Sequence, residues 1–175
     1  MLCVGALIPK LSLEKRGTSG GILMQARFEL ATVAPAAYKV MWGLEKCVRQ
    51  TGLDKKILEL IKTRASQING CAFCIDMHIK DARNNGETEQ RIYALNAWRE
   101  TPFYTPEERA VLALAESVTL VCDTHVSDAV YEEVSGYFNQ NQIAQILMTI
   151  VTINAWNRIS VATRMIPGAY SVTTS

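Results

Sequence analysis

The sequence predicts an all-α protein with a single domain, and three observations support this fold class. Apolar residues recur at helical spacing in successive windows from Ala34 onward, and no window shows sustained alternation with a period of two. Residues that start or end helices separate these windows. The segments between the windows are short, which favours antiparallel packing of neighbouring helices. A chain of 175 residues can bury a sizeable core in one domain.

Start and stop residues place the expected helices along the chain. They cover residues 34–52, 54–69, 71–84, 88–99, 105–118, 127–138 and 141–164. The clearest start is at Thr105, which is expected as N-cap, with Pro106 at the first helical position and Glu108 at the third. Asp54 is expected to cap the second helix in the same way. The most apolar segment, residues 143–153, indicates a buried core helix.

Residues 1–23 are predicted to be an N-terminal extension, and residues 24–175 the helical domain. The stretch from Lys15 to Gly21 has the composition of a flexible linker. Residues 1–8 are apolar, but they lack the flanking features of a signal peptide. Met24 is an alternative start of translation, so the extension is interpreted as a flexible appendage or as a start-site artefact.

Composition excludes several function classes. The net charge is +1 and no basic stripe with interleaved aromatics is present, so no nucleic-acid partner is expected. No segment has the roughly 20 apolar residues that a membrane helix needs, so no membrane partner is expected. The five cysteines are odd in number and mostly scattered, which favours a reducing, cytoplasmic location over a secreted disulfide framework.

The candidate site lies around a Cys-x-x-Cys pair. Cys71, Cys74 and His78 are spaced i, i+3 and i+7, so on a helix they share one face. The helix is expected to begin after Asn69-Gly70, which puts both thiols in its first turn. Backbone N–H groups and the positive end of the helix dipole lower a thiol pKa there, and the thiolate is the reactive form. The pattern therefore predicts a redox dithiol with a histidine base.

Two other interpretations of the cysteine pair stay open. A structural zinc site needs a second ligand pair, but the other cysteines are isolated and His125 is the only other histidine. A three-ligand zinc site of Cys71, Cys74 and His78, or two unreactive core thiols, would also fit the spacing. We favour the dithiol, and we expect neither a metal nor a cofactor.

Glu59 is the fourth candidate residue. It stands among apolar residues of the preceding helix, where a buried carboxylate without a partner would be costly. It either faces solvent or orients His78 and holds its proton, as in a triad.

The remaining marked residues are expected to be structural. Three tryptophans are assigned to the core: Trp42, Trp98 and Trp156. Two isolated cysteines are expected to be packed thiols: Cys47 and Cys122. Asp76 and Asp81 are expected to favour the helix or its surface, and His125 is expected to be exposed in a turn.

Glu59, Cys71, Cys74 and His78 stand in the pattern Glu-x11-Cys-x2-Cys-x3-His. This pattern resembles the signature of the AhpD-like alkylhydroperoxidases of the carboxymuconolactone decarboxylase superfamily. Flanking residues 65–70, 96–100 and 154–158 are similar as well, and the likeness covers about residues 24–167. The resemblance implies an AhpD-like helical bundle that forms homo-oligomers, as trimers or as hexamers built from dimers.

The resemblance also implies a cofactor-free thiol peroxidase of antioxidant defence. Cys74 would attack a hydroperoxide, and Cys71 would then form a disulfide with it. His78 would take the thiol proton and Glu59 would relay it. An external dithiol, on a lipoylated or thioredoxin-like protein, would reduce the disulfide. One departure is Phe73, because the best-studied members carry a second histidine at that position.

Three alternative functions are open at this point. One is a decarboxylase of the type that names the superfamily. Another is a redox sensor without turnover, and the third is a zinc-binding module.

Overall fold

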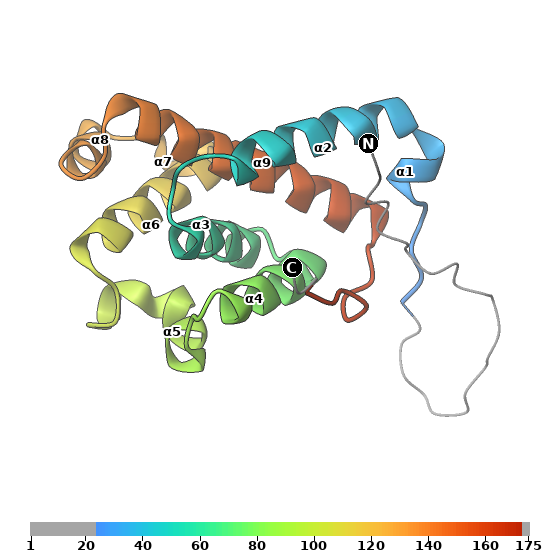
Figure 1. Cartoon of the computed structure of the whole chain (residues 1–175), viewed down its shortest axis with the longest axis horizontal. Coiled ribbons are helices and arrows are strands. Elements are labelled where there is room, and N and C mark those ends of the chain that lie inside the picture. The colour runs from blue at the N-terminus through green and yellow to red at the C-terminus, as the bar shows by residue number, and fades with distance from the viewer. Residues whose placement is uncertain (1–23, 173–175) are drawn as a thin grey trace.

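The computed structural model describes residues 24–172, and within them the chain forms an all-α domain (Figure 1). This confirms the predicted fold class. The expected extension, residues 1–23, lies outside the described residues. None of the described helices is long and apolar enough to cross a membrane.

The described residues form nine α-helices and one 3-10 helix. In chain order they are α1 (Leu30–Val33), α2 (Pro35–Arg49), α3 (Lys55–Ile68), α4 (Ala72–Asn84), α5 (Glu89–Ala94), η1 (Leu95–Glu100), α6 (Pro106–Thr119), α7 (Val121–Thr124), α8 (Asp128–Ser135) and α9 (Gln140–Thr163). The helix expected over 88–99 is shorter than predicted. Ala97 has non-helical angles (φ −120°, ψ 29°), and the chain continues beyond α5 as η1.

Side-chain caps set the start of several helices. The Asp54 carboxylate accepts the Lys56 N–H at 2.6 Å. At α6, the Thr105 hydroxyl accepts the Glu108 N–H, and the Glu108 carboxylate accepts the Thr105 N–H in return. These contacts satisfy N–H groups that have no partner within a helix. The caps predicted at Asp54 and Thr105 are therefore confirmed.

Helix α3 occupies the centre of the domain. It packs against α4, α6 and α9, and α2 crosses α9 (Figure 1). The main core contains fully buried aliphatic residues from these helices, among them Ile61, Leu114 and Ile150. The buried face of α4, which carries Cys74 and His78, therefore lies close to α3, the helix with the largest buried share.

Helix α9 is buried on one face only. Ile146, Ile150 and Ile153 are buried, whereas Met148 and Val151 are exposed. The prediction that residues 143–153 form a buried helix is therefore correct only for the face that carries these three isoleucines. The outer face of α9 lies on the molecular surface.

Some of the structural assignments were wrong. Trp98 is buried as predicted, but Trp42 of α2 is 44% exposed. Its ring packs edge-to-face against Tyr38 and Trp156, with centroids about 6 Å away. Cys47 and Cys122 are exposed instead of packed. Cys47 lies on the outward side of α2, and Cys122 lies in the short α7, which contributes no buried residue.

The capping contacts of α6 give a stability prediction. Replacing Thr105 by Ala removes the hydroxyl that accepts the Glu108 N–H, and should lower the free energy of unfolding by about 1 kcal/mol. Thr105→Ser keeps the hydroxyl and should cost much less. Urea unfolding at one protein concentration measures both. Equal losses in the two variants would contradict the role of the cap.

Candidate active site

The turn between α3 and α4 positions the cysteine pair. Gly70 adopts a φ of +66°, a left-handed conformation that glycine takes without strain. Cys71 then serves as the N-cap of α4, and its Sγ accepts the Cys74 N–H at 3.3 Å. The predicted break at Asn69-Gly70 and the placement of both cysteines at the helix start are thus observed.

An amide network fixes this turn on α9. The Asn69 Nδ2 donates to the Oδ1 of Asn154 at 3.0 Å and to the Oδ1 of Asn157 at 2.9 Å. The Asn157 Nδ2 donates in turn to the Ser66 hydroxyl at 3.0 Å. Because Asn69 lies two residues before Cys71, the network determines where the cysteine helix begins relative to α9.

Cys71 and Cys74 form a disulfide inside the protein. Their Cα atoms are 5.3 Å apart, within the usual range for such a bond. Each residue is only 1% exposed. Ala65 and Ile153 complete this small apolar cluster, and Phe73 and Trp156 pack against it from the side.

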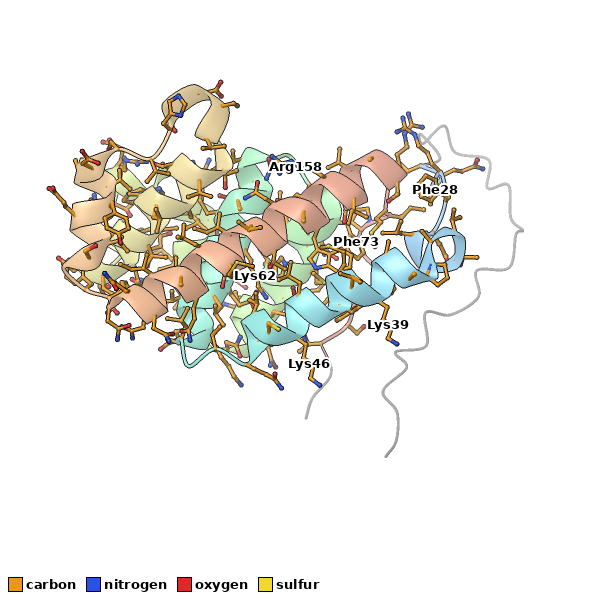
Figure 2. The ribbon with its side chains drawn as sticks, turned by 90° about the horizontal axis from the view of Figure 1, so that it is seen from above. Phe28, Lys39, Lys46, Lys62, Phe73 and Arg158 are labelled. Atoms are coloured by element: carbon orange, nitrogen blue, oxygen red, sulfur yellow. A yellow bond between two sulfur atoms is a disulfide. The ribbon has the colours of Figure 1, made fainter. Side chains whose placement is uncertain are left out.

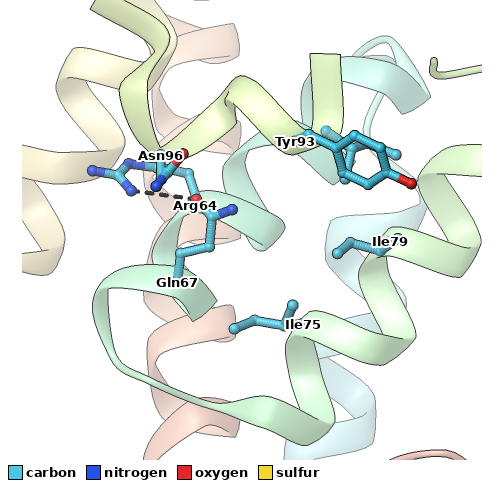
Figure 3. A pocket seen from close by; sticks show the side chains of 7 residues that line it. Arg64, Gln67, Ile75, Ile79, Tyr93 and Asn96 are labelled. Carbon is cyan, nitrogen blue, oxygen red and sulfur yellow. Dashed lines mark hydrogen bonds between the residues drawn. The ribbon is translucent and has the colours of Figure 1, made fainter. Parts of the chain in front are cut away.

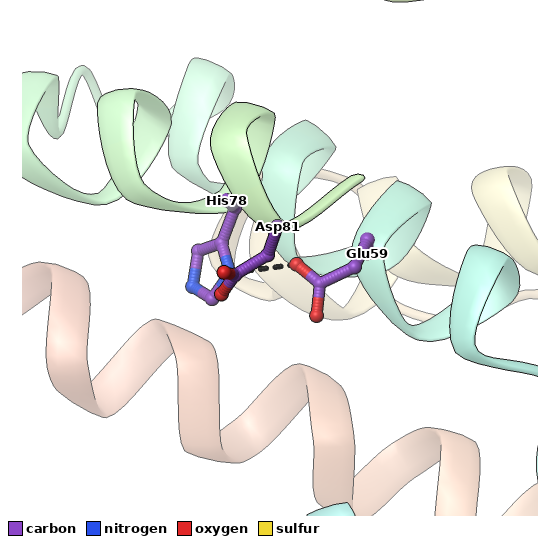
Figure 4. Close-up of side chains that lie close together, drawn as sticks. All are labelled: Glu59, His78 and Asp81. Atoms are coloured by element: carbon purple, nitrogen blue, oxygen red, sulfur yellow. Dashed lines mark hydrogen bonds and ion pairs between the residues drawn. The ribbon is translucent and has the colours of Figure 1, made fainter. Parts of the chain in front are cut away.

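His78 lies one turn further along α4, and its ring is held by Glu59. The His78 Nδ1 is 2.9 Å from the Glu59 Oε2, which reaches across from α3 (Figure 4). Since a carboxylate can only accept, Nδ1–H is the donor. Nε2 is then the ring nitrogen that can accept a proton. The two residues are 3% and 9% exposed, so Glu59 is buried beside His78 and does not face solvent.

Glu59 belongs to a buried chain of charges that joins α2 and α3. The Lys62 ammonium lies 4.0 Å from Glu59 Oε1 and donates to Glu45 Oε1 at 3.0 Å. Arg49 donates to the same Glu45 oxygen at 3.0 Å. Lys62 is 3% exposed, whereas Lys39 and Lys46 project outward from α2 (Figure 2). Each buried charge here has an opposite charge beside it, as the cost of burial requires.

Asp81 adjoins the candidate site, where the sequence analysis did not expect it. It follows His78 by three residues on α4, and its carboxylate lies beside the His78 ring (Figure 4). One ligand-type atom each from Glu59, His78 and Asp81 lies within 4.8 Å of the others. The Tyr170 hydroxyl donates to Asp81 Oδ1 at 2.6 Å. Burial raises the pKa of Asp81 and the charge of Glu59 adds to this rise, while the hydrogen bond from Tyr170 opposes it.

This group of three side chains is better suited to hold protons than a metal ion. Glu59 and His78 already bind each other, and Asp81 already accepts the Tyr170 hydroxyl. The Lys62 ammonium, 4.0 Å from Glu59 Oε1, already balances part of the negative charge that a metal ion would need. We therefore assign no metal to these residues.

Two surface depressions flank the helices that carry the site. One, of about 460 Å³, lies between α3, α4 and α5 and is lined by Arg64, Gln67, Ile75, Ile79, Ile92, Tyr93 and Asn96 (Figure 3). The other, of about 310 Å³, is lined by Asn69, Asn157, Arg158, Val161 and Ala162. None of the four predicted site residues lines either depression, but the second one borders the turn that leads into Cys71.

The fold and the arrangement of cysteines, histidine and glutamate define an AhpD-like helical protein. Residues 35–117 match the model of the carboxymuconolactone decarboxylase family. The uncharacterized protein YdfG of Bacillus subtilis is 48% identical over 139 residues, which make up 79% of this chain and 95% of that protein. The chain belongs to the carboxymuconolactone decarboxylase family.

Solved structures agree with this assignment. A protein of unknown function from Agrobacterium tumefaciens, for which a role in antioxidant defence as AhpD has been suggested, is 41% identical with a TM-score of 0.81. The match covers 82% of this chain and 99% of that one. The debrominase Bmp8 is 21% identical with a TM-score of 0.69, covers 77% of this chain and 73% of its own, and shows the shared fold alone.

All four predicted site residues lie on the contact between α3 and α4. Spacing could place Cys71, Cys74 and His78 on one face, and the structure buries all three there. Asp81 continues that pattern, because it lies at i+3 from His78, and this spacing was the available signal for it. No sequence pattern linked Tyr170 to the site, since it lies 89 residues away from Asp81 in sequence.

The buried charges predict a specific dependence of stability on pH. Burial raises the pKa of Glu45, but the charge of Lys62 and hydrogen bonds from Lys62 and Arg49 outweigh it and lower this pKa below the ordinary 4.5. A carboxyl with a lowered pKa stabilises the fold above its unfolded value and loses that effect as pH falls through the folded value. Glu45→Gln should therefore be less stable at pH 7, and its stability should fall less steeply below about pH 4.5.

Urea unfolding between pH 7 and pH 3 measures this difference. Glu132→Gln, at an exposed position of α8, is the matched control and should follow the wild type. Parallel curves for the wild type and Glu45→Gln would contradict a charged Glu45–Lys62 pair.

Proposed function

We propose that this protein is a thiol-dependent peroxidase that reduces hydroperoxides through a Cys71/Cys74 dithiol–disulfide cycle. The observation that carries the proposal is the disulfide at the start of α4, one turn from a histidine whose Nδ1 is bound by a buried carboxylate. This arrangement has a nucleophile, a base and a group that orients the base.

The first half of the cycle oxidises Cys74. His78 accepts the proton of the Cys74 thiol at Nε2, and the thiolate attacks the terminal oxygen of the hydroperoxide. The O–O bond breaks, Cys74 becomes a sulfenic acid, and the leaving alkoxide takes the proton from His78 to form an alcohol. Cys71 then attacks the Cys74 sulfur, water leaves, and the disulfide forms.

The second half returns the protein to the dithiol. An external dithiol attacks the disulfide, forms a mixed disulfide, and leaves as its own disulfide after a second exchange. We propose a lipoylated or thioredoxin-like protein as this donor. Because both cysteines are 1% exposed, the side chains packed around them, which include Phe73 and Trp156, have to rearrange before a protein donor reaches the sulfur atoms.

Two opposing effects act on the Cys74 thiol. Burial among Ala65, Ile153 and Phe73 disfavours the thiolate. The start of α4 and the imidazole of His78 favour it. Phe73 adds no base of its own, so His78 is the proposed proton acceptor of the site and Glu59 stabilises the charge that His78 gains.

The relatives support the broader function class. The family includes enzymes, and an antioxidant role has been suggested for the Agrobacterium tumefaciens protein. We propose a cytoplasmic protein that works without a cofactor as a trimer or as a hexamer of dimers. The apolar side chains exposed on α2 and α9, including Trp42 and Val151, provide surface for contact with further copies of the chain.

Peroxide consumption by the reduced protein tests the proposal. The wild type should lose the mass of two hydrogen atoms on treatment with an alkyl hydroperoxide, and a dithiol should restore repeated turnover. Cys74→Ser should not react, and His78→Ala should react about 100-fold more slowly, since general bases contribute about that much or more. Cys47→Ser removes an exposed cysteine outside the site and should behave as the wild type.

Other outcomes would identify the alternatives. Lactone decarboxylation that persists in Cys74→Ser would favour the activity that names the family. Disulfide formation without turnover by any dithiol would indicate a sensor. A stoichiometric metal bound through Cys71 and Cys74 would indicate a zinc module, and each of these results would contradict the peroxidase.

A further inference from the structure

The chain beyond α9 returns along α4 and contacts it at three positions (Figure 1). The Gly168 N–H donates to Asp76 Oδ2 at 3.0 Å, and the Lys80 ammonium donates to the Tyr170 carbonyl oxygen at 3.1 Å. The Tyr170 hydroxyl donates to Asp81 at 2.6 Å. We call residues 165–172 the C-terminal strap, because these contacts tie the segment to the helix that carries the cysteines.

The last of these contacts reaches the proposed proton acceptor. Asp81 stands next to His78, and Glu59 approaches the same ring from α3 (Figure 4). His78 therefore has two carboxylates beside it, although only Glu59 forms a hydrogen bond with it. A negative charge within about 4–6 Å favours the protonated form of a base, so Asp81 can stabilise the imidazolium that forms when Cys74 loses its proton.

Asp81 carries out this role only if it is ionised and turned toward His78. Burial and the charge of Glu59 work against ionisation, while His78, Arg49 of α2 and the Tyr170 hydroxyl favour it. Tyr170 is itself held as a neutral donor, because burial and the hydrogen bond to Asp81 raise its pKa. The strap thus supplies the contact that keeps the Asp81 carboxylate in place.

We propose that Asp81 and Tyr170 are positioning residues of the dithiol site, and that the C-terminal strap holds the Asp81 carboxylate beside His78 through the Tyr170 hydroxyl. The inference rests on the proposed function for its link to catalysis. The reactivity of the Cys74 thiol, on which the two residues are proposed to act, can be measured without any peroxide.

The experiment measures the rate at which iodoacetamide labels Cys74 in the reduced protein between pH 5 and pH 9, followed by peptide mass spectrometry. Asp81→Asn removes the charge beside His78, and labelling at pH 7 should fall on the order of tenfold. Tyr170→Phe removes only the hydroxyl. The pKa of Asp81 should then rise further, so the loss of labelling toward acid should begin at a higher pH than in the wild type.

Two further variants separate positioning from a general loss of structure. Asp76→Asn removes a charge from the same helix but leaves a side-chain oxygen that can accept the Gly168 N–H, so the strap stays in place. Asp76 is not part of the group around His78, so labelling should stay as in the wild type. In the double variant Asp81→Asn/Tyr170→Phe, the two effects should not add, because Tyr170 acts through Asp81.

Three results would show that Asp81 and Tyr170 do not act as proposed. A wild-type labelling profile in Tyr170→Phe, additive effects in the double variant, or an equal loss in Asp76→Asn would overturn the inference. Peroxide assays on the same samples test the proposed function separately from this inference. If the wild type consumes no peroxide but labelling responds as expected, the peroxidase is excluded while the positioning roles stand.

Discussion

Glu59 is a carboxylate on the most buried helix of the protein, and the requirement that it be partnered governs how the neighbouring helices dock. Nine residues of α3 are buried, and two of them, Glu59 and Lys62, are ionisable. An unpaired charge in such a position would cost several kcal/mol, roughly the stability margin of a small domain. The partners come from other helices: His78 on α4 binds Glu59, and Glu45 on α2 binds Lys62. The pairing of these charges and the burial of the apolar core therefore both favour the same arrangement of α2, α3 and α4.

The same packing holds the residues of the proposed site on rigid elements. Cys71, Cys74 and His78 belong to one helix and its cap, and their partners lie on α3 and α9. The amide network from Asn69 to Asn157 fixes the start of that helix, so the cysteines and the histidine keep one position relative to Glu59. Groups held in this way need little reorganisation when charge develops on them, which is the usual basis of electrostatic catalysis.

Local patterns predicted the features that depend on neighbours in sequence. Helix periodicity, the caps at Asp54 and Thr105 and the shared face of Cys71, Cys74 and His78 all follow from spacings of a few residues. Features that depend on distant segments could not be predicted. An amphipathic helix does not indicate whether another element covers its second face, which is why Trp42 and Cys47 were wrongly placed in the interior. Similarly, nothing near Asp81 in the sequence indicates that Tyr170 will reach it from the far end of the chain.

The site combines two requirements that oppose each other. Burial shields the cysteine sulfurs from solvent, yet it also disfavours the thiolate on which their reactivity depends. In the proposed cycle, the proton that leaves Cys74 must therefore go to a group whose charged form is stabilised inside the protein. His78 between Glu59 and Asp81 meets this condition, and Asp81 is the more accessible of the two carboxylates. In the proposed cycle, the cysteines can therefore stay buried while the proton of Cys74 moves to a base whose charged form is stabilised.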